Sequence, residues 1–134
     1  MGLIVDTSVF VHAERAKKNI DFRRWDRFGE IAVSAITAAE LLVGVHRADS
    51  PARRANRLAF VEGVLAAVKV VDYTLDVARV HAELLATLVQ RGQMIGPYDL
   101  IVAATALCRG AAVLTSNVDE FARVPNLQVL NLFE

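Results

Sequence analysis

Several acidic residues stand where a short apolar segment gives way to a helix. Asp6 follows the apolar residues 3–5, and Glu40 lies early in the predicted helix after a second apolar segment. Asp99 lies in the first turn of a helix that begins at Pro97, and Asp119 and Glu120 follow a later apolar segment. Carboxylates in such places either cap helices or, where several meet, bind a divalent cation.

Helix capping explains each acid taken alone. Asp6 suits an N-cap, because aspartate accepts hydrogen bonds from the free N–H groups at a helix start. Thr37 and Glu40 have the spacing of a capping box, and so do Asn117 and Glu120. Asp99 in a first turn is favoured by the helix dipole. One acid therefore does not distinguish a structural role from a chemical one.

The alternation of apolar runs with helical patterns predicts an α/β fold. Short, continuously apolar strands between helices are typical of a parallel sheet covered on both faces. We expect one domain, residues 1–134, built as a three-layer α/β/α sandwich around a mainly parallel sheet of about five short strands. The predicted strands are 2–6, 31–33, 68–72, 111–115 and 127–132, and the predicted helices are 8–16, 21–29, 35–48, 51–67, 74–91 and 97–110.

In such a sheet the carboxyl ends of the strands share one edge, where ligands bind. Asp6 and residues 117–120 belong at that edge, and Glu40 and Asp99 reach it if their helices pack beside it. Carboxylates that meet there repel one another, and no lysine or arginine stands at these junctions. A cation with oxygen ligands, Mg²⁺ or Mn²⁺, resolves the conflict and suits phosphoryl chemistry. The nearby hydroxyls, which either orient a carboxylate or form turns, are Thr7, Ser8, Thr115 and Ser116.

Composition limits the class of protein. The 134 residues carry 15 basic and 15 acidic side chains, a balance that argues against a purely electrostatic nucleic-acid binder. No apolar run approaches the roughly 18 residues of a membrane span, and no signal-peptide pattern precedes Asp6, so we expect a cytoplasmic protein.

The single cysteine, Cys108, excludes an internal disulfide and is interpreted as a core residue. The histidines, interpreted as surface or interface residues, are His12, His46 and His81.

Four motifs in this order resemble the PIN-domain ribonucleases, and within them the VapC-type toxins of bacterial toxin–antitoxin pairs. The motifs are IVDTSVF (4–10), AAELLVG (38–44), GPYDLIVAATAL (96–107) and VLTSNVDEFARVPNLQV (113–129). The resemblance covers essentially the whole chain. It implies a compact α/β/α fold, Mg²⁺- or Mn²⁺-dependent endonuclease action on RNA, a homodimer, and inhibition by a cognate VapB-type antitoxin.

The resemblance also assigns site residues. Asp6, Glu40 and Asp99 stand at the family's first three acids, which act as catalytic residues and metal ligands. For the fourth, Asn117 stands where the family often has an aspartate, and we prefer Asp119 over Glu120. The supporting residues are Thr7, Ser8, Thr115, Asn117 and Glu120, and the basic residues expected to hold RNA phosphates are Arg15, Lys17, Lys18, Arg23 and Arg24.

Together, resemblance and chemistry predict hydrolysis by metal-activated water, leaving 5′-phosphate and 3′-hydroxyl ends. One alternative is a phosphate-transfer domain with Asp6 as nucleophile, although no lysine follows a late strand to hold a phosphoryl group. Another is a non-catalytic interaction module whose acids only cap helices. An apolar set that either lines a groove for the antitoxin or belongs to the core comprises Phe22, Trp25, Phe28, Leu58, Phe60, Val61 and Leu65.

Overall fold

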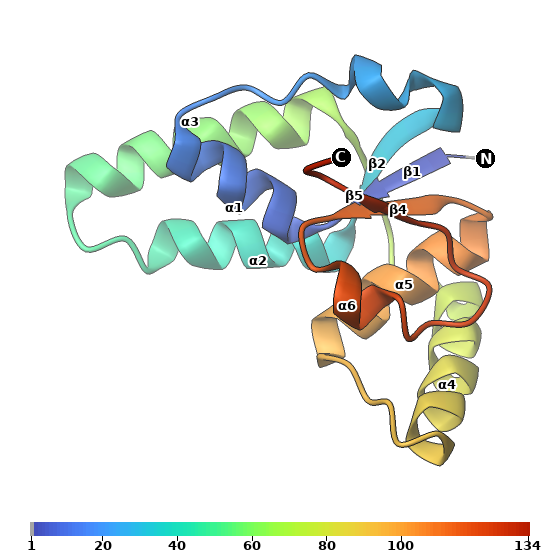
Figure 1. Ribbon diagram of the computed structural model, residues 1–134. Helices are drawn as coiled ribbons and strands as arrows, with labels where there is room; N and C mark the ends of the chain where they lie inside the picture. Colours follow the sequence, from blue (N-terminus) through green and yellow to red (C-terminus); the bar gives the residue numbers. More distant parts are fainter. Residues whose placement is uncertain (1) are drawn as a thin grey trace.

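The computed structural model describes residues 2–134, whose five strands form one sheet in the order β3-β2-β1-β4-β5 (Figure 1). Every neighbouring pair is parallel. The chain builds outward from the central β1 first to one side and then to the other, so the winding direction reverses between β1 and β4. The predicted parallel α/β fold is confirmed. The strands are β1 (Gly2–Val5), β2 (Glu30–Ser34), β3 (Lys69–Val71), β4 (Ala112–Thr115) and β5 (Val129–Asn131).

Helices cover both faces of this sheet, with α1 and α3 on one side and α4 and α5 on the other (Figure 1). This arrangement gives the expected three layers. The helices are α1 (Thr7–Ala16), α2 (Ala35–His46), α3 (Pro51–Ala67), α4 (Leu75–Gln90), α5 (Pro97–Arg109) and the short α6 (Val118–Phe121). The sequence did not predict α6 as a separate helix.

The segment predicted as a helix over 21–29 is a 3-10 helix, η1 (Phe22–Phe28), with a kink at Trp25. Its aromatic residues recur every three positions, which matches the three residues per turn of a 3-10 helix. Asp21 caps it by accepting a hydrogen bond from the backbone N–H of Arg23. Trp25 is buried against the sheet, whereas Phe22 and Phe28 are only partly buried.

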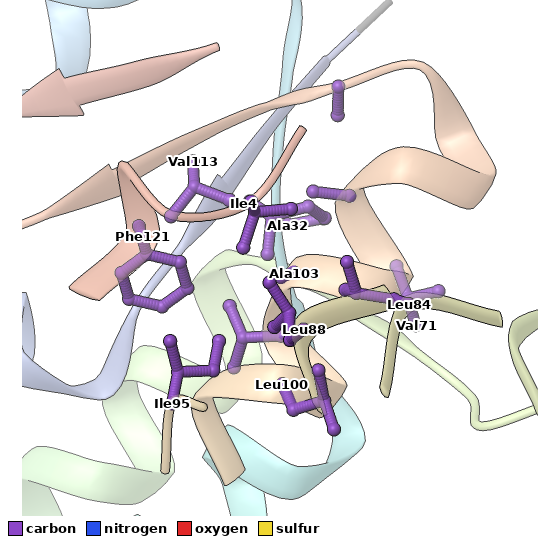
Figure 2. Close-up of a cluster of buried hydrophobic side chains, with 14 residues drawn as sticks. Ile4, Ala32, Val71, Leu84, Leu88, Ile95, Leu100, Ala103, Val113 and Phe121 are labelled. Atoms are coloured by element: carbon purple, nitrogen blue, oxygen red, sulfur yellow. The ribbon is translucent and has the colours of Figure 1, made fainter. Parts of the chain in front are cut away.

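Alternating strand residues divide the core into two apolar clusters. Leu3 and Val5 pack toward α1, α2 and α3, whereas Ile4 packs toward α4 and α5. Figure 2 shows the second cluster, in which Ile4 and Val113 of the sheet meet the side chains of Leu88 and Leu100. Because β1 and β4 are covered on both faces, the ends of these two strands are fixed by packing.

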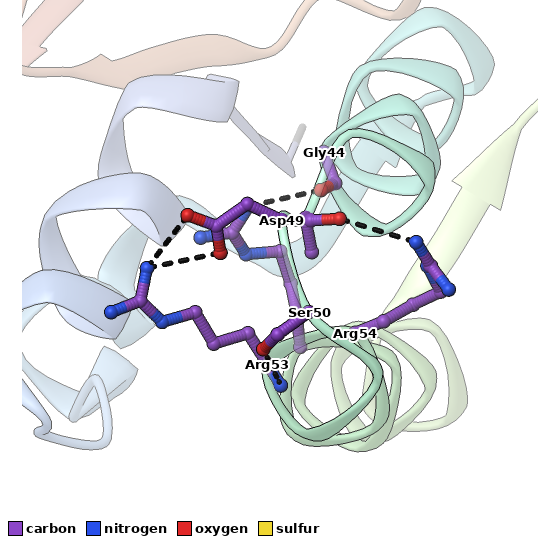
Figure 3. Close-up of polar contacts among 7 residues, drawn as sticks. Gly44, Asp49, Ser50, Arg53 and Arg54 are labelled. Atoms are coloured by element: carbon purple, nitrogen blue, oxygen red, sulfur yellow. Dashed lines mark hydrogen bonds and ion pairs between the residues drawn. The ribbon is translucent and has the colours of Figure 1, made fainter.

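Arg57 of α3 joins three helices. Its Nη1 donates to the backbone oxygen of Gly44 in α2 at 2.9 Å, and its Nε donates to Oε1 of Glu14 in α1 at 3.1 Å. Arg54 donates to the oxygen of Ala48 in the same α2–α3 corner, which Figure 3 shows. These contacts hold α2, and with it Glu40, beside α1.

Cys108 is exposed, so its interpretation as a core residue was wrong. The buried stretch of α5 ends at Ala106, and the helix then emerges from the layers before its C-cap at Gly110. No helix within residues 2–134 is both long and apolar enough to span a bilayer.

Adjacent residues of α4 provide a test of the core. Leu88 is fully buried, whereas Val89 is 57% exposed. We expect Leu88→Ala to lower the free energy of unfolding by about 2–5 kcal/mol, because it leaves a cavity beneath the sheet. Val89→Ala should change it by no more than about 0.5 kcal/mol. Urea denaturation measures both, and equal losses would contradict this packing.

Candidate active site

Asp6 lies directly after the central strand and is 3% exposed. Although it occupies the N-cap position of α1, its side chain makes no capping hydrogen bond. Instead Oδ2 accepts from Ser8 Oγ at 2.7 Å and from Thr115 Oγ1 at 2.9 Å. The capping explanation of this carboxylate therefore does not hold.

Backbone amides orient both hydroxyls toward Asp6. Ser8 Oγ accepts from the N–H of Ser116 at 3.1 Å, and Thr115 Oγ1 accepts from that of Asn117 at 2.8 Å. A hydroxyl that accepts an amide proton has its own proton free to donate. Asp6 Oδ1 accepts no hydrogen bond from residues 2–134. Since no unpartnered side-chain oxygen there is fully buried, Oδ1 opens onto the surrounding cavity.

Glu40 is positioned by a chain of two threonines. Thr7 Oγ1 donates to Glu40 Oε1 at 2.7 Å and lies 3.1 Å from Thr37 Oγ1, which is fully buried. The single proton of Thr7 is shared between the carboxylate, at the shorter distance, and the hydroxyl oxygen of Thr37, which accepts from it. Ser34, not Thr37, caps α2, so residues 37–40 do not form a capping box. Burial raises the pKa of Glu40, and the Thr7 hydrogen bond opposes that rise.

Asp99, Asn117 and Glu120 form a third group. Asn117 Nδ2 donates to Asp99 Oδ2 at 3.3 Å and to Glu120 Oε2 at 3.1 Å, and the two carboxyls also share a hydrogen bond. Burial, the hydrogen bond to Glu120 and the charges of Asp6, Glu120 and Glu40 raise the pKa of Asp99 to about 8. The same hydrogen bond, received by Glu120, lowers the pKa of Glu120. The two carboxyls thus titrate as a pair, with the pKa of Asp99 raised and that of Glu120 lowered.

These three groups surround a cavity of about 420 Å³ at the edge of the sheet where the winding direction reverses. The site lies where open parallel sheets bind ligands, because the strand ends on either side diverge. No three acidic, histidine or cysteine side chains within residues 2–134 converge closely enough, as they stand, to hold one metal ion. The cavity is lined by Asp6, Thr7, Ser8, Val11, His12, Arg15, Glu40, Asp99, Ser116 and Asn117.

The structure brings most of the expected site residues together, with one exchange. Glu120 contacts Asp99, whereas Asp119 is exposed on α6 and forms no hydrogen bond or ion pair within residues 2–134. The structure therefore brings Glu120, and not Asp119, to Asp99. The reason is α6 itself, whose turn directs residue 120 toward Gly96 and Asp99.

Of the basic residues expected near the site, only Arg15 lines the cavity. Lys18 lines a separate, largely apolar cavity of about 400 Å³ that lies between α1, η1 and α3. Arg23 pairs with Asp21, and Arg24 donates to the backbone oxygen of Glu134 and lies over the ring of Trp25. Lys17 is the exposed C-cap residue of α1.

Two contributors were not identified from the sequence. The role of Thr37 was missed because its spacing to Glu40 suggested only a capping box. His12 lines the cavity, although the sequence placed it at a general surface. The spacing of Ser8, His12 and Arg15, at positions i, i+4 and i+7, marks one face of α1 and is the pattern that would have revealed His12.

Comparison with known proteins agrees with this geometry. The PIN domain family model matches residues 3–127. Ribonuclease VapC1 of Rickettsia felis is 34% identical over 98% of this chain and 97% of its own, and the tRNA(fMet)-specific endonuclease VapC of Shigella flexneri is 33% identical over 96% of each. A DNA-bound VapBC from Salmonella typhimurium superposes with a TM-score of 0.86, at 30% identity and 98% coverage of each chain. The chain therefore belongs to the PIN domain family, within which it groups with the VapC ribonucleases.

Proposed function

We propose that this protein is a Mg²⁺- or Mn²⁺-dependent endoribonuclease and the toxin of a VapBC-type toxin–antitoxin module. The observation that carries the proposal is the meeting of Asp6, Glu40 and Asp99 around one cavity at the sheet edge. Burial, the hydrogen bond to Glu120 and the charges of the neighbouring acids together raise the pKa of Asp99, and a bound cation would oppose that rise.

The donor set fits a hard divalent cation, because the acids that meet at the cavity offer carboxylate oxygens. The side chains stand in separate groups, so holding one ion through three of them would require these side chains to come closer together, with Asp99 ionised. Asp6 needs no such change, since Oδ1 already opens onto the cavity while Oδ2 is held by Ser8 and Thr115. Asp6, Asp99, Glu40 and Glu120 are the residues that would hold the ion.

When bound, such an ion lowers the pKa of a water and offsets negative charge on the phosphate that the water attacks. The chain supplies the orientation. Thr7 fixes the carboxylate of Glu40, which can accept a proton from the attacking water, and Asn117 holds the carboxyls of Asp99 and Glu120. Attack by water, not by the ribose 2′-hydroxyl, leaves a 5′-phosphate and a 3′-hydroxyl.

Phosphate binding falls to Arg15, which reaches the cavity from α1. Lys17, Lys18, Arg23 and Arg24 extend a basic surface beyond it, and their exposure suits contacts to RNA phosphates further along the strand. The alternative of a phosphate-transfer domain lacks support, because no lysine of the described residues lines the cavity around Asp6.

A VapB-type antitoxin is the proposed partner, as the solved relatives include VapBC assemblies. The largely apolar cavity between α1, η1 and α3, lined in part by Phe22 and Phe60, is a suitable seat for an apolar segment. Trp25 and Val61 are buried instead, and so belong to the core. We further propose a homodimer that acts in the cytoplasm, where its RNA would lie.

Cleavage of RNA tests the proposed activity. The purified protein, freed of partners, should cut total bacterial RNA in Mg²⁺ or Mn²⁺ and stop in EDTA. Asp99→Asn should lower the rate by roughly 10²–10⁴-fold, because it removes a charged group that the reaction needs. Glu120→Gln should lower the rate more than Asp119→Asn does. Discrete products that survive both EDTA and Asp99→Asn would contradict the proposal.

Thr7 gives a second test. Thr7→Val removes the hydrogen bond to Glu40 and leaves the buried Thr37 hydroxyl without its partner. We expect kcat to fall by about 10- to 100-fold, because the carboxylate of Glu40 loses its orientation. KM should change little, because the RNA keeps its contacts. Thr7→Ser, which keeps the hydroxyl, should restore most of the rate. A serine variant as slow as the valine variant would refute this role.

Thermal unfolding measures the charge conflict without any RNA. The pKa of Asp99 is about 8 in the folded protein, against 3.8 for an aspartate free in water, so the metal-free fold loses stability as pH rises from about 4 through 8. Asp99→Asn does not titrate and should melt about 3–5 °C above the parent at pH 9, a shift of roughly 1 kcal/mol for a half-buried, solvent-screened group. At pH 5 the difference should shrink.

The same melts test the cation. Mg²⁺ or Mn²⁺ should raise the melting temperature of the parent at pH 8 and raise that of Asp99→Asn much less. Equal shifts in both proteins would place the cation elsewhere.

A further inference from the structure

An aromatic pair, which we call the aromatic rim, stands beside the acidic cavity. It consists of His12, which lines that cavity, and Phe133 near the C-terminal end of the chain. Their ring centroids lie 5.0 Å apart and their planes meet at 83°, an edge-to-face arrangement. Figure 1 shows how the C-terminal segment runs along the edge of the sheet as β5 and then turns toward α1.

Phe133 is held in an exposed position. Its side chain is 62% exposed, while its backbone N–H donates to Asn131 Oδ1 at 3.0 Å. The next residue is tied down as well, because the N–H of Glu134 donates to the oxygen of Asn131 at 3.3 Å and Arg24 donates to the oxygen of Glu134. An anchored backbone therefore presents an apolar ring that the core does not cover.

The acidic cavity needs such a surface if it is to hold RNA. Its carboxylates repel a polyanion, and among residues 2–134 Arg15 is the one lysine or arginine that lines it. Proteins that bind single-stranded RNA combine cationic contacts to phosphates with aromatic rings on which unpaired bases stack. Arg15 and His12 lie about one turn apart on the same face of α1, so a phosphate contact and an aromatic surface adjoin.

We propose that the aromatic rim is a nucleobase subsite, in which an unpaired base of the RNA next to the cleaved phosphate stacks on Phe133. His12 fixes the Phe133 ring from the side of the cavity, and Arg15 contacts the neighbouring phosphate. The inference rests on the proposed function, because it assigns a binding site to the same RNA. A base that stacks there must be unpaired, since a base within a duplex offers no free face.

The experiment uses a single-stranded RNA oligonucleotide that the parent cleaves, together with a series in which one nucleotide at a time lacks its base. Phe133→Leu keeps apolar bulk without the aromatic face, and Phe133→Tyr keeps the face. Tyr73→Leu is the matched control, because Tyr73 is also an exposed aromatic residue but its ring packs against His81, which does not line the cavity. Melting temperatures establish that each variant is folded.

Phe133→Leu should raise KM by about 5- to 20-fold with kcat nearly unchanged, as expected for one lost stacking contact. Phe133→Tyr and Tyr73→Leu should behave like the parent. At one position beside the cleaved bond, removal of the base should raise the KM of the parent by a similar factor and leave that of Phe133→Leu unaltered.

Three results would overturn the inference. If loss of the base has the same effect in the parent and in Phe133→Leu at every position, no base stacks there. If Phe133→Leu cleaves like the parent but escapes inhibition by a partner protein, the rim binds protein instead. A folded parent that cleaves no RNA in either metal overturns the proposed function as well, which the first two results leave intact.

Discussion

The burial of one carboxylate at the end of the central strand is the constraint on which the rest of the site depends. Asp6 is held there because Ser8 and Thr115, each supplied with a backbone proton, donate to one of its oxygens. A buried charge without such partners would be costly. The two hydroxyls connect β1 to α1 and to the loop after β4. This network therefore also fixes the spacing of β1 and β4, between which the winding direction of the sheet reverses.

The other acids are positioned around Asp6 by contacts among the helices, away from the cavity itself. Arg57 ties α2 and α3 to α1, which brings Glu40 to the hydroxyl of Thr7. α5 packs under the sheet through its apolar residues and places Asp99 in its first turn at the same edge. Each helix is stabilised by its own apolar face, so the fold tolerates carboxylates that repel one another.

The conflict among the carboxylates links stability to function. In the protein without a cation, a proton shared between Asp99 and Glu120 relieves the repulsion. That proton leaves only one of these two carboxyls ionised. A cation would relieve it by a different route and leave all the acids ionised. The residues that destabilise the metal-free fold at high pH are thus the ones proposed to bind the cation. This is expected of a site whose carboxylates are neutralised by a bound ion.

The sequence by itself determined the fold class, because buried strands and amphipathic helices alternate with clear periods, and it determined the acids at the strand ends. Topology alone placed Asp6 at the edge of the sheet, whereas Glu40 and Asp99 were expected there only if their helices packed beside it. Tertiary structure decided what local spacing could not. The turn of α6 brings Glu120 rather than Asp119 to Asp99, and Ser34 rather than Thr37 caps α2. Contacts between residues distant in the chain, such as His12 with Phe133, arise only when the sheet brings its two ends together.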